Sequence, residues 1–396
     1  MRMSLAVILA VVVFLADCTR LSSTMPQPLK GTPINQGYDA TPTVAPLMSF
    51  SILYTFSGGV DGGAPGGHLI RDAAGNLYGT TSGGGKYNRG VAFKLDSSGI
   101  ETVLHSFSAS DGTDPTAGLV RDASGNLYGT TSSGGAYNDG VVFKLHPSGR
   151  ETVLHNFNGR DGATPSAALV RDAAGNLYGT APNGGANNGG VIFMVDTSGH
   201  ETVLHNFELP NGSAPFGDLL RDAAGNLYGT TAQGGGHNDG VIFELDSSGN
   251  YIVLHRFSGR DGEGPFGGLV RDVAGNLYGT ACCGGADFDG VVFKLEPIGD
   301  ESVLHSFNYA DGFEPMGDLV RDVAGNLYGT TPFGGDGVGV VFKLDSNGHE
   351  NVLHLFSGSD GYEPVGGLVR DSAGDLYGAT MLGGQYHSGV VFKLTP

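Results

Sequence analysis

Cysteine and basic residues are scarce in this sequence. The three cysteines, Cys18, Cys282 and Cys283, are too few for a disulfide framework. The adjacent pair Cys282–Cys283 replaces polar residues of other repeats, and with no Cys-x-x-Cys spacing we interpret it as structural rather than as a metal or redox site. Acidic residues outnumber basic ones by 40 to 21, which gives a formal net charge of −19. A surface of this sign repels phosphate groups, so nucleic acid is not expected as a partner.

Helical periodicity is missing after the first twenty residues. Glycine is abundant, 70 of 396 residues, but it has no G-X-Y period, which excludes collagen. Apolar residues make up 39% of the chain and recur at fixed positions, which excludes a disordered glycine-rich tract. Short runs of valine, leucine, phenylalanine and tyrosine between glycines predict many strands joined by tight turns.

The N-terminal stretch MRMSLAVILAVVVFLADCTR resembles an export signal. Its apolar run, from Leu5 to Ala16, is too short to span a bilayer. The run ends in Leu-Ala-Asp-Cys, which resembles a bacterial lipobox, although Asp17 stands where a small residue is usual. We therefore predict an export signal over residues 1–17, lipidation at Cys18 with simple secretion as the alternative, and a Pro-, Thr- and Ser-rich tether over residues 18–50. The predicted location is extracytoplasmic, with membrane contact only through the lipid.

From residue 51 onward the chain repeats one unit of 49 or 50 residues seven times. One arginine per unit shows the period: Arg71, Arg121, Arg171, Arg221, Arg271, Arg321 and Arg370. Each unit contains four predicted strands, written GLVRD, NLYGTT, GVVFKL and ETVLHSF in the first copies, with the tight turn AAGN between the first two. Four strands in each of seven units predict an all-β fold, a seven-bladed β-propeller over residues 51–396.

The two ends of the array predict how the ring closes. Residues 51–56, SILYTF, correspond to a fourth strand, and the chain stops after a third strand. The N-terminal strand is therefore expected to complete the last blade and to remove the exposed edges. An open β-solenoid is the alternative, but it would need capping repeats, and none is visible in the sequence.

The repeat resembles a known family. A composite of the units, GLVRDAAGNLYGTT followed by GGVVFKLD and ETVLHSF, is similar to the GloVer repeat of bacterial choice-of-anchor tandem-repeat proteins, over all seven units. The resemblance implies an exported protein and no established activity. More loosely, D-x-x-G-N-L-Y is similar to NHL-type and streptogramin-lyase-like propellers, which implies the blade architecture and transfers no catalytic residue.

Two loops of each unit are expected on the same face of the ring. The loop that leads into the next blade carries D-G-x-x-P, where we interpret the aspartate as closing an Asx-turn. Calcium is the one ion considered there, and no other cofactor is expected. The loop between the second and third strands varies, and aromatic rings beside amides suit a sugar-binding surface. The candidate ligand-binding residues are Tyr87, Asn88, Tyr137, Asn138, His237, Asn238, Phe288, Tyr386 and His387.

Catalytic signatures are absent from the sequence: no G-x-S-x-G, HExxH, P-loop or EF-hand pattern occurs. The repeated histidines, such as His105, are expected on outer strands in a scaffold role, and the repeated arginines are expected to pair with carboxylates. No cluster of non-repeated polar residues on the ring axis is visible. We interpret the protein as a binding module for a glycan or a protein at the cell envelope. A metal-dependent propeller enzyme, such as a lyase or lactone hydrolase, and a structural envelope protein are the alternatives.

Overall fold

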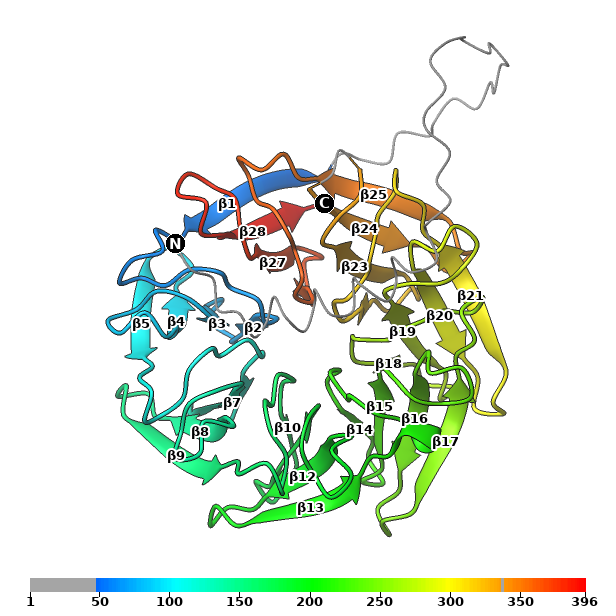
Figure 1. Cartoon of the computed structure of the whole chain (residues 1–396). Coiled ribbons are helices and arrows are strands. Elements are labelled where there is room, and N and C mark those ends of the chain that lie inside the picture. Colours follow the sequence, from blue (N-terminus) through cyan, green and yellow to red (C-terminus); the bar gives the residue numbers. More distant parts are fainter. Residues whose placement is uncertain (1–47, 336–337) are drawn as a thin grey trace, which may run out of the picture. The chain divides into compact units, whose positions relative to one another are not determined.

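Short strands alternate with glycine-rich turns throughout the computed structural model, which describes residues 48–335 and 338–396. The strands form seven four-stranded antiparallel sheets arranged in a ring, which confirms the predicted seven-bladed propeller (Figure 1). The predicted signal, Cys18 and residues 18–47 of the predicted tether lie outside the described residues. Among the described residues the one helical element is the 3₁₀-helix η2 (Leu209–Asn211), and no helix there is long and apolar enough to cross a membrane.

Each blade has the same strand order from the axis outward. The innermost strands are β2 (Ile70–Arg71), β6 (Val120–Arg121), β10 (Val170–Arg171), β14 (Leu220–Arg221), β18 (Val270–Arg271), β22 (Val320–Arg321) and β26 (Val369–Arg370). The second strands are β3 (Leu77–Thr81), β7 (Leu127–Thr131), β11 (Leu177–Ala181), β15 (Leu227–Thr231), β19 (Leu277–Ala281), β23 (Leu327–Thr331) and β27 (Leu376–Thr380). The third strands are β4 (Val91–Leu95), β8 (Val141–Leu145), β12 (Val191–Val195), β16 (Val241–Leu245), β20 (Val291–Leu295), β24 (Val340–Leu344) and β28 (Val390–Thr395). The outer strands are β5 (Glu101–Ser106), β9 (Glu151–Asn156), β13 (Glu201–Asn206), β17 (Tyr251–Arg256), β21 (Glu301–Ser306), β25 (Glu350–Leu355) and β1 (Ser49–Thr55). We number the blades from blade 1 (β2–β5) to blade 7 (β26–β28 and β1).

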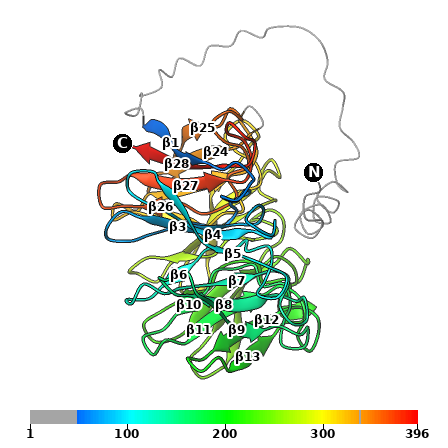
Figure 2. The same ribbon diagram turned by 90° about the vertical axis from the view of Figure 1, so that its left-hand side faces the viewer.

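The N-terminal strand closes the ring, as predicted. β1 pairs antiparallel with β28, with Ile52 opposite Phe392, and becomes the outer strand of blade 7 (Figure 2). It begins at Ser49, two residues before the predicted start of the array. The Phe50 ring stacks on His354 of blade 6, with ring centroids 3.8 Å apart. One strand therefore joins the first part of the array to both blades 6 and 7.

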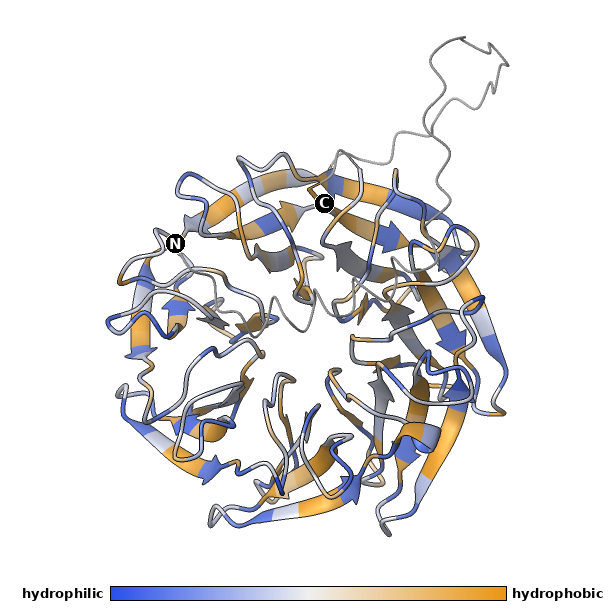
Figure 3. Ribbon diagram, in the orientation of Figure 1, coloured by the Kyte–Doolittle hydropathy of each residue, from blue (hydrophilic) through white to orange (hydrophobic). Residues whose placement is uncertain are grey.

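The hydrophobic core lies between neighbouring blades. The third strands are almost fully buried, and in Figure 3 the apolar residues of the blades alternate with polar ones. One core cluster joins Tyr78 and Ala92 of blade 1 to Leu127 and Phe143 of blade 2. Phe107, at the junction of these blades, meets Phe143 edge to face with the centroids 5.0 Å apart. Since each cluster belongs to two blades, a blade is stable only beside its neighbours.

The repeated RDxxGN stretch is a turn held by its aspartate. Asp122 Oδ1 accepts hydrogen bonds from the N–H groups of Ser124 and Asn126, each at 2.9 Å. Asp122 Oδ2 accepts from Asn126 Nδ2 at 2.7 Å and from the Tyr128 hydroxyl at 3.0 Å. Burial alone would raise the pKa of Asp122, but these hydrogen bonds hold that pKa below its ordinary value. The repeated Asp, Gly and Asn are therefore scaffold.

Removing this aspartate should destabilise the ring measurably. We expect Asp122→Ala to lower the free energy of unfolding by about 2 kcal/mol, because several hydrogen bonds to one charged group are lost together. Urea unfolding followed by circular dichroism measures the change. The matched control is Ser124→Ala in the same turn, whose side chain is exposed and which should change the stability by less than about 0.5 kcal/mol. A change below 0.5 kcal/mol in Asp122→Ala would contradict the role given to the turn.

The repeated arginines connect blades. The expected carboxylate partner is found for Arg71, which lies 3.5 Å from Asp371, and for Arg271, which lies 3.5 Å from Asp222. More generally, the guanidinium of a blade lies over the tyrosine ring of the preceding blade, and Arg271 over Tyr228 has a distance of 5.3 Å to the ring centroid. The same arrangement occurs for Arg71 on Tyr377, Arg121 on Tyr78, Arg221 on Tyr178, Arg321 on Tyr278 and Arg370 on Tyr328. Cation–π contacts therefore supplement the predicted ion pairs.

The two long loops of each unit pack on each other on one face. Thr113 and Ser133 exchange backbone hydrogen bonds of 2.8 and 3.1 Å, and the other units have the equivalent bridge. The D-G aspartate does close its loop, but not as a forward Asx-turn: Asp111 Oδ1 accepts from the N–H of Ser108, three residues earlier, and Oδ2 lies 3.1 Å from His105 Nε2. His105 lies on the outer strand β5, as predicted. This long-loop face surrounds the axial opening.

Candidate functional site

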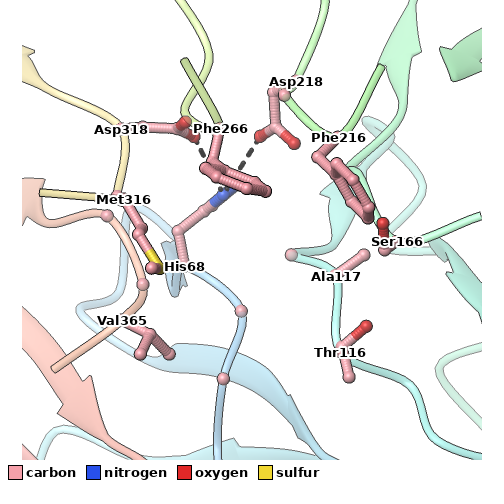
Figure 4. Close-up of a pocket in the computed structure, with 17 residues that line it drawn as sticks. His68, Thr116, Ala117, Ser166, Phe216, Asp218, Phe266, Met316, Asp318 and Val365 are labelled. Carbon is pink, nitrogen blue, oxygen red and sulfur yellow. Dashed lines mark ion pairs between the residues drawn. The ribbon is translucent and has the colours of Figure 1, made fainter. Parts of the chain in front are cut away.

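The repeat symmetry is broken at one position that faces the axis. It lies just before the leucine that precedes each innermost strand. The residues at this position are His68, Gly118, Ala168, Asp218, Gly268, Asp318 and Gly367. Most blades have a small residue there, whereas blades 1, 4 and 6 place ionisable side chains, and these converge in the centre of the ring (Figure 4). We call His68, Asp218 and Asp318 the axial cluster.

The axial cluster brings three blades into contact through one imidazole. His68 Nδ1 lies 3.3 Å from Asp218 Oδ2 and 3.6 Å from Asp318 Oδ2. The second oxygen of each aspartate is held by the backbone: the N–H of Ala168 donates to Asp218 Oδ1 at 2.6 Å, and the N–H of Gly268 donates to Asp318 Oδ1. Each carboxylate is thus anchored on one oxygen and presents the other to the axis.

The two carboxylates repel each other. Burial, together with the negative charge of Asp318, raises the pKa of Asp218 well above its ordinary value. About a quarter of each of the three side chains is exposed to solvent (24% for His68, 23% for Asp218 and 28% for Asp318). The cluster therefore favours a positive charge, either a proton or a cation, between groups that a solute can reach.

Glycines leave the room that the cluster occupies. A Cβ atom on Gly118 would lie 2.5 Å from the ring of His68. A Cβ atom on Gly268 would lie 3.0 Å from Asp218 and from Asp318, and one on Gly367 would lie 3.0 Å from Asp318. None of these glycines has a positive φ, so space rather than backbone conformation requires them. The small and the ionisable residues at this position therefore complement one another.

Cavities lie on both sides of the axial cluster. The outer one, about 110 Å³, is lined by residues from all seven blades and opens on the long-loop face. The inner one, about 260 Å³, continues along the innermost strands, and His68, Asp218 and Asp318 border both. The outer cavity has room for several water molecules or for part of a ligand. A solute that enters from the long-loop face therefore meets the cluster.

The rim of the outer cavity has one apolar and one small-residue side. Its residues follow the proline of each D-G-x-x-P loop: Gly66, Thr116 and Ser166, then Phe216, Phe266, Met316 and Val365 (Figure 4). The Phe216 and Phe266 rings are neighbours, with centroids 5.3 Å apart and planes tilted by 42°. The opening therefore offers aromatic surface on one side and ionisable groups at its base. We call this combination the axial mouth.

The expectation that no polar cluster occupies the axis is wrong. The residues that form the cluster lie outside the variable loops, at the position before Leu69 and its equivalents. That position, with one histidine and two aspartates among glycine and alanine, was a visible signal. These three residues form a cluster only because the segments that lead into the innermost strands meet at a common centre. Residue spacing alone does not reveal that arrangement.

The predicted loop residues lie at separate loop tips. Tyr87, Tyr137, Phe288 and Tyr386 are all more than half exposed. Asn88, Asn138, Asn238, Phe288 and His387 have φ between 54° and 70°. The amide oxygen of each of these asparagines accepts the N–H of the glycine four residues before it, so these amides stabilise their own turns. In the described part of the chain no hydrogen bond or ring contact joins tips of different blades, and His237 is likewise exposed at its own tip. Their role in ligand binding stays a prediction.

A second set of ionisable groups lies between the outer strands. His155, Asp161 and Glu201 have ligand atoms within 4.8 Å of one another, and so do His255, Asp261 and Glu301. The glutamates share one environment: burial and the aspartate of the preceding blade raise the pKa of Glu201 and of Glu301 to about 7. At the junction of blades 3 and 4 the same places hold Tyr251 and Asn211, and the Tyr251 hydroxyl donates to the Asn211 carbonyl at 2.7 Å. Because this set recurs around the ring, we interpret it as part of the blade interface.

The two described cysteines lie together in blade 5. Cys282 and Cys283 are buried, and their sulfur atoms are 2.9 Å apart. Cys282 Sγ also lies 3.6 Å from the carbonyl oxygen of Glu263, in the facing loop. Both residues thus belong to the packing of the two long loops, consistent with the structural interpretation.

Fold and repeat together define a seven-bladed β-propeller built from tandem copies of one blade. The chain belongs to the Gloeobacter/Verrucomicrobia repeat family, whose model matches residues 38–238 and 215–396. The resemblance noted in the sequence is thereby confirmed. No curated protein matches the chain.

Solved structures share the fold at low sequence identity. The extracellular domain of the proposed hybrid two-component system BT3049 from B. thetaiotaomicron is 12% identical, with a TM-score of 0.58 over 89% of this chain and 41% of that one. The corresponding domain of BT4673 is 11% identical, with a TM-score of 0.58 over 87% and 39%. A proposed 6-phosphogluconolactonase from Bacteroides uniformis is 13% identical, with a TM-score of 0.51 over 79% and 88%. The chain thus spans about two fifths of the length of the two extracellular domains, and the likeness concerns the fold alone.

Proposed function

We propose that the protein is an extracytoplasmic binding module that takes the end of a glycan at the axial mouth. One observation carries the proposal: the axial mouth combines large apolar and ionisable side chains that the other blades lack at the same positions. These differences lie around the axis, where one solute can contact several blades at once. Phe216 and Phe266 supply rings on which a sugar can stack, and the axial cluster supplies groups that orient hydroxyls.

Location and attachment are part of the same proposal. The export signal over residues 1–17 and the lipid on Cys18 would place the propeller outside the cytoplasm on a tether. The likeness to two propellers that are extracellular domains agrees with this location. The loop-tip tyrosines stay in the proposal as a second contact surface, and a protein partner is the alternative to a glycan.

The ligand-binding test is thermal unfolding of the mature chain in the presence of cell-wall and plant glycans. A ligand that binds only the native state adds about 2.7 kcal/mol to the free energy of unfolding when its concentration is a hundred times Kd. The melting temperature rises as a consequence. We expect one glycan class to raise it by several degrees, and the double variant Phe216→Ser, Phe266→Ser to abolish the shift. Serine already stands at this position in blade 3, as Ser166, so the variant should fold.

The matched control separates the axial mouth from the loop tips. The triple variant Tyr87→Ala, Tyr137→Ala, Tyr386→Ala changes exposed rings only and should keep the shift. Loss of the shift in this variant but not in the phenylalanine variant would move the site to the loop tips. If no glycan shifts the melting temperature of the unmodified chain, the glycan proposal fails.

Hydrolysis of a sugar lactone is the second candidate function. It is favoured by the placement of Asp218 beside Asp318 on the axis, where burial and the neighbouring carboxylate raise the pKa of Asp218, since a carboxyl that holds a proton can act as a general acid. A panel of aldonolactones followed by pH-stat titration tests it. Turnover that disappears in Asp218→Ala supports the enzyme, and absence of turnover with every lactone rejects this candidate.

A further inference from the structure

We propose that the axial cluster is a binding site for one divalent transition-metal ion, such as Zn²⁺ or Mn²⁺. Its protein ligands are His68 Nδ1, Asp218 Oδ2 and Asp318 Oδ2. Water, or a group of a ligand in the axial mouth, completes the coordination. The inference does not depend on the proposed glycan, because an ion can occupy the site with or without it.

The distances within the cluster fit an ion better than direct hydrogen bonds. Zinc lies about 2.0–2.2 Å from nitrogen and oxygen ligands, so the ligand atoms of a tetrahedral site lie about 3.3–3.5 Å apart. The observed separations are 3.3 Å from His68 Nδ1 to Asp218 Oδ2 and 3.6 Å to Asp318 Oδ2. Hydrogen bonds between nitrogen and oxygen span about 2.7–3.2 Å. The three ligand atoms, all within 4.8 Å of one another, thus leave space for an ion between them.

The ligands are held in place before any ion binds. The backbone N–H groups of Ala168 and Gly268 fix one oxygen of each aspartate, which aims the other oxygen at the axis. Gly118 lets the His68 ring lie flat against the backbone of blade 2, where a Cβ atom would be 2.5 Å from that ring. Supports of this kind orient metal ligands in proteins. The cavities on either side give an entry path and an open coordination position.

The donor set selects the kind of ion. Two carboxylates and one neutral imidazole carry a total charge of −2, which matches a divalent cation. Imidazole nitrogen suits zinc, and carboxylate oxygen suits manganese, whereas calcium takes six to eight oxygen ligands and magnesium prefers oxygen and water. The cluster offers only two free carboxylate oxygens. We therefore expect Zn²⁺ and Mn²⁺ to bind more tightly than Ca²⁺ or Mg²⁺.

The axial site differs from the His-Asp-Glu groups between outer strands. In those groups the histidine lies 3.0 to 3.2 Å from its aspartate, closer than in the axial cluster, and the arrangement recurs from blade to blade. They open neither to the axis nor to either of the two axial cavities. A single equivalent of metal is thus expected per chain, at the one cluster that occurs once.

The experiment is isothermal titration of the metal-stripped mature chain with ZnCl₂ and with MnCl₂. We expect one ion per chain. His68→Ala and Asp318→Gly should each weaken binding about a hundredfold, because one of three ligands is lost. Alanine or glycine already occupies this position in blades 2, 3, 5 and 7, so both variants should unfold within about 2 °C of the unmodified chain.

Two further variants make the assignment specific. Gly118→Ala keeps all three ligands but displaces the His68 ring, and it should weaken binding about tenfold or more. His255→Gln, in an outer-strand group, should leave the affinity unchanged. Absence of binding by the unmodified chain, or undiminished binding by His68→Ala, would overturn the proposal and leave the cluster as an ion pair between a charged imidazole and two carboxylates. Loss of binding in His255→Gln alone would also overturn it, since the ion would then lie between outer strands.

Discussion

A chain that lacks β1, with residues 48–55 deleted, should lose the stable closed ring. The deletion removes every hydrogen bond between β1 and β28 and leaves blade 7 with three strands. It also removes the Phe50 ring from between His354, Phe356 and Phe392. Removing a fully buried large aromatic residue costs about 3–5 kcal/mol, and the half-buried Phe50 contributes part of that amount. We expect the melting temperature to fall by more than about 10 °C, and the exposed edge of β28 to promote association that light scattering detects.

A peptide of residues 48–56 provides the rescue for this deletion. Added in excess, it should occupy the vacant edge by strand addition and raise the melting temperature in proportion to the logarithm of its concentration. A peptide with Phe50 replaced by alanine should rescue less well. The point variant Ile52→Thr in the full chain is the control, because Ile52 is 40% exposed, and it should unfold close to the unmodified protein. A truncated chain that stays monomeric and equally stable would show that β1 does not close the ring.

The stability of the ring should fall as the pH rises from 6.5 to 8. Burial, together with an aspartate of the preceding blade, raises the pKa of Glu101, Glu151, Glu201 and Glu301 to about 7, and of Glu350 to about 8. An unfolded glutamate ionises at its ordinary pKa of 4.5. The folded protein therefore holds protons that the unfolded chain has released, and each glutamate contributes stability that is lost as the pH rises through its folded pKa.

The buried histidines oppose this trend only at lower pH. Burial lowers the pKa of His155, His205, His305 and His354, so the folded state binds fewer protons there than the unfolded chain. That contribution increases with pH but is complete once the unfolded histidines are neutral, above their ordinary value of 6.5. Between pH 6.5 and 8 the glutamates dominate, and we expect the melting temperature to fall by several degrees.

Variants of the five glutamates isolate the cause of the pH dependence. A chain with all five replaced by glutamine should show a flatter stability curve above pH 6.5, because glutamine does not titrate. The blade 3–4 junction is a natural control, since Tyr251 and Asn211 stand there in place of the two carboxylates. Replacing Asn211 by serine should leave the slope of stability against pH unchanged, because Asn211 faces Tyr251 and not a glutamate. A pH profile that stays equally steep in the five-glutamine chain would rule out these groups.

The architecture could be predicted from sequence because it depends on local, repeated chemistry. The arginine, the RDxxG turn and the apolar third strand recur in every unit, so the same local structure can be predicted for each blade. Ring closure could be predicted because the array begins with a fourth strand and ends after a third strand, so that the first strand can complete the last blade. The arginines were harder: a carboxylate was predicted, but the tyrosine of the preceding blade became visible only once the blades were placed side by side.

The candidate site could not be predicted in the same way. His68, Asp218 and Asp318 are 150 and 100 residues apart, and only the geometry of the closed ring brings them to one point. The amides of Asn88 and Asn138 looked suited to binding sugar hydroxyls, yet their positive φ and their bonds to Gly84 and Gly134 serve the turns. The sequence shows which positions differ between blades. Only the direction of the side chains shows whether the residues at those positions come together as a site.

Anomalous diffraction from crystals soaked in MnCl₂ would locate an ion at the axial cluster. We expect one manganese peak bounded by His68 Nδ1, Asp218 Oδ2 and Asp318 Oδ2, and no peak in crystals of Asp218→Ala. Peaks confined to the His-Asp-Glu groups between outer strands, or an axis without manganese at saturating concentration, would contradict the proposed metal site.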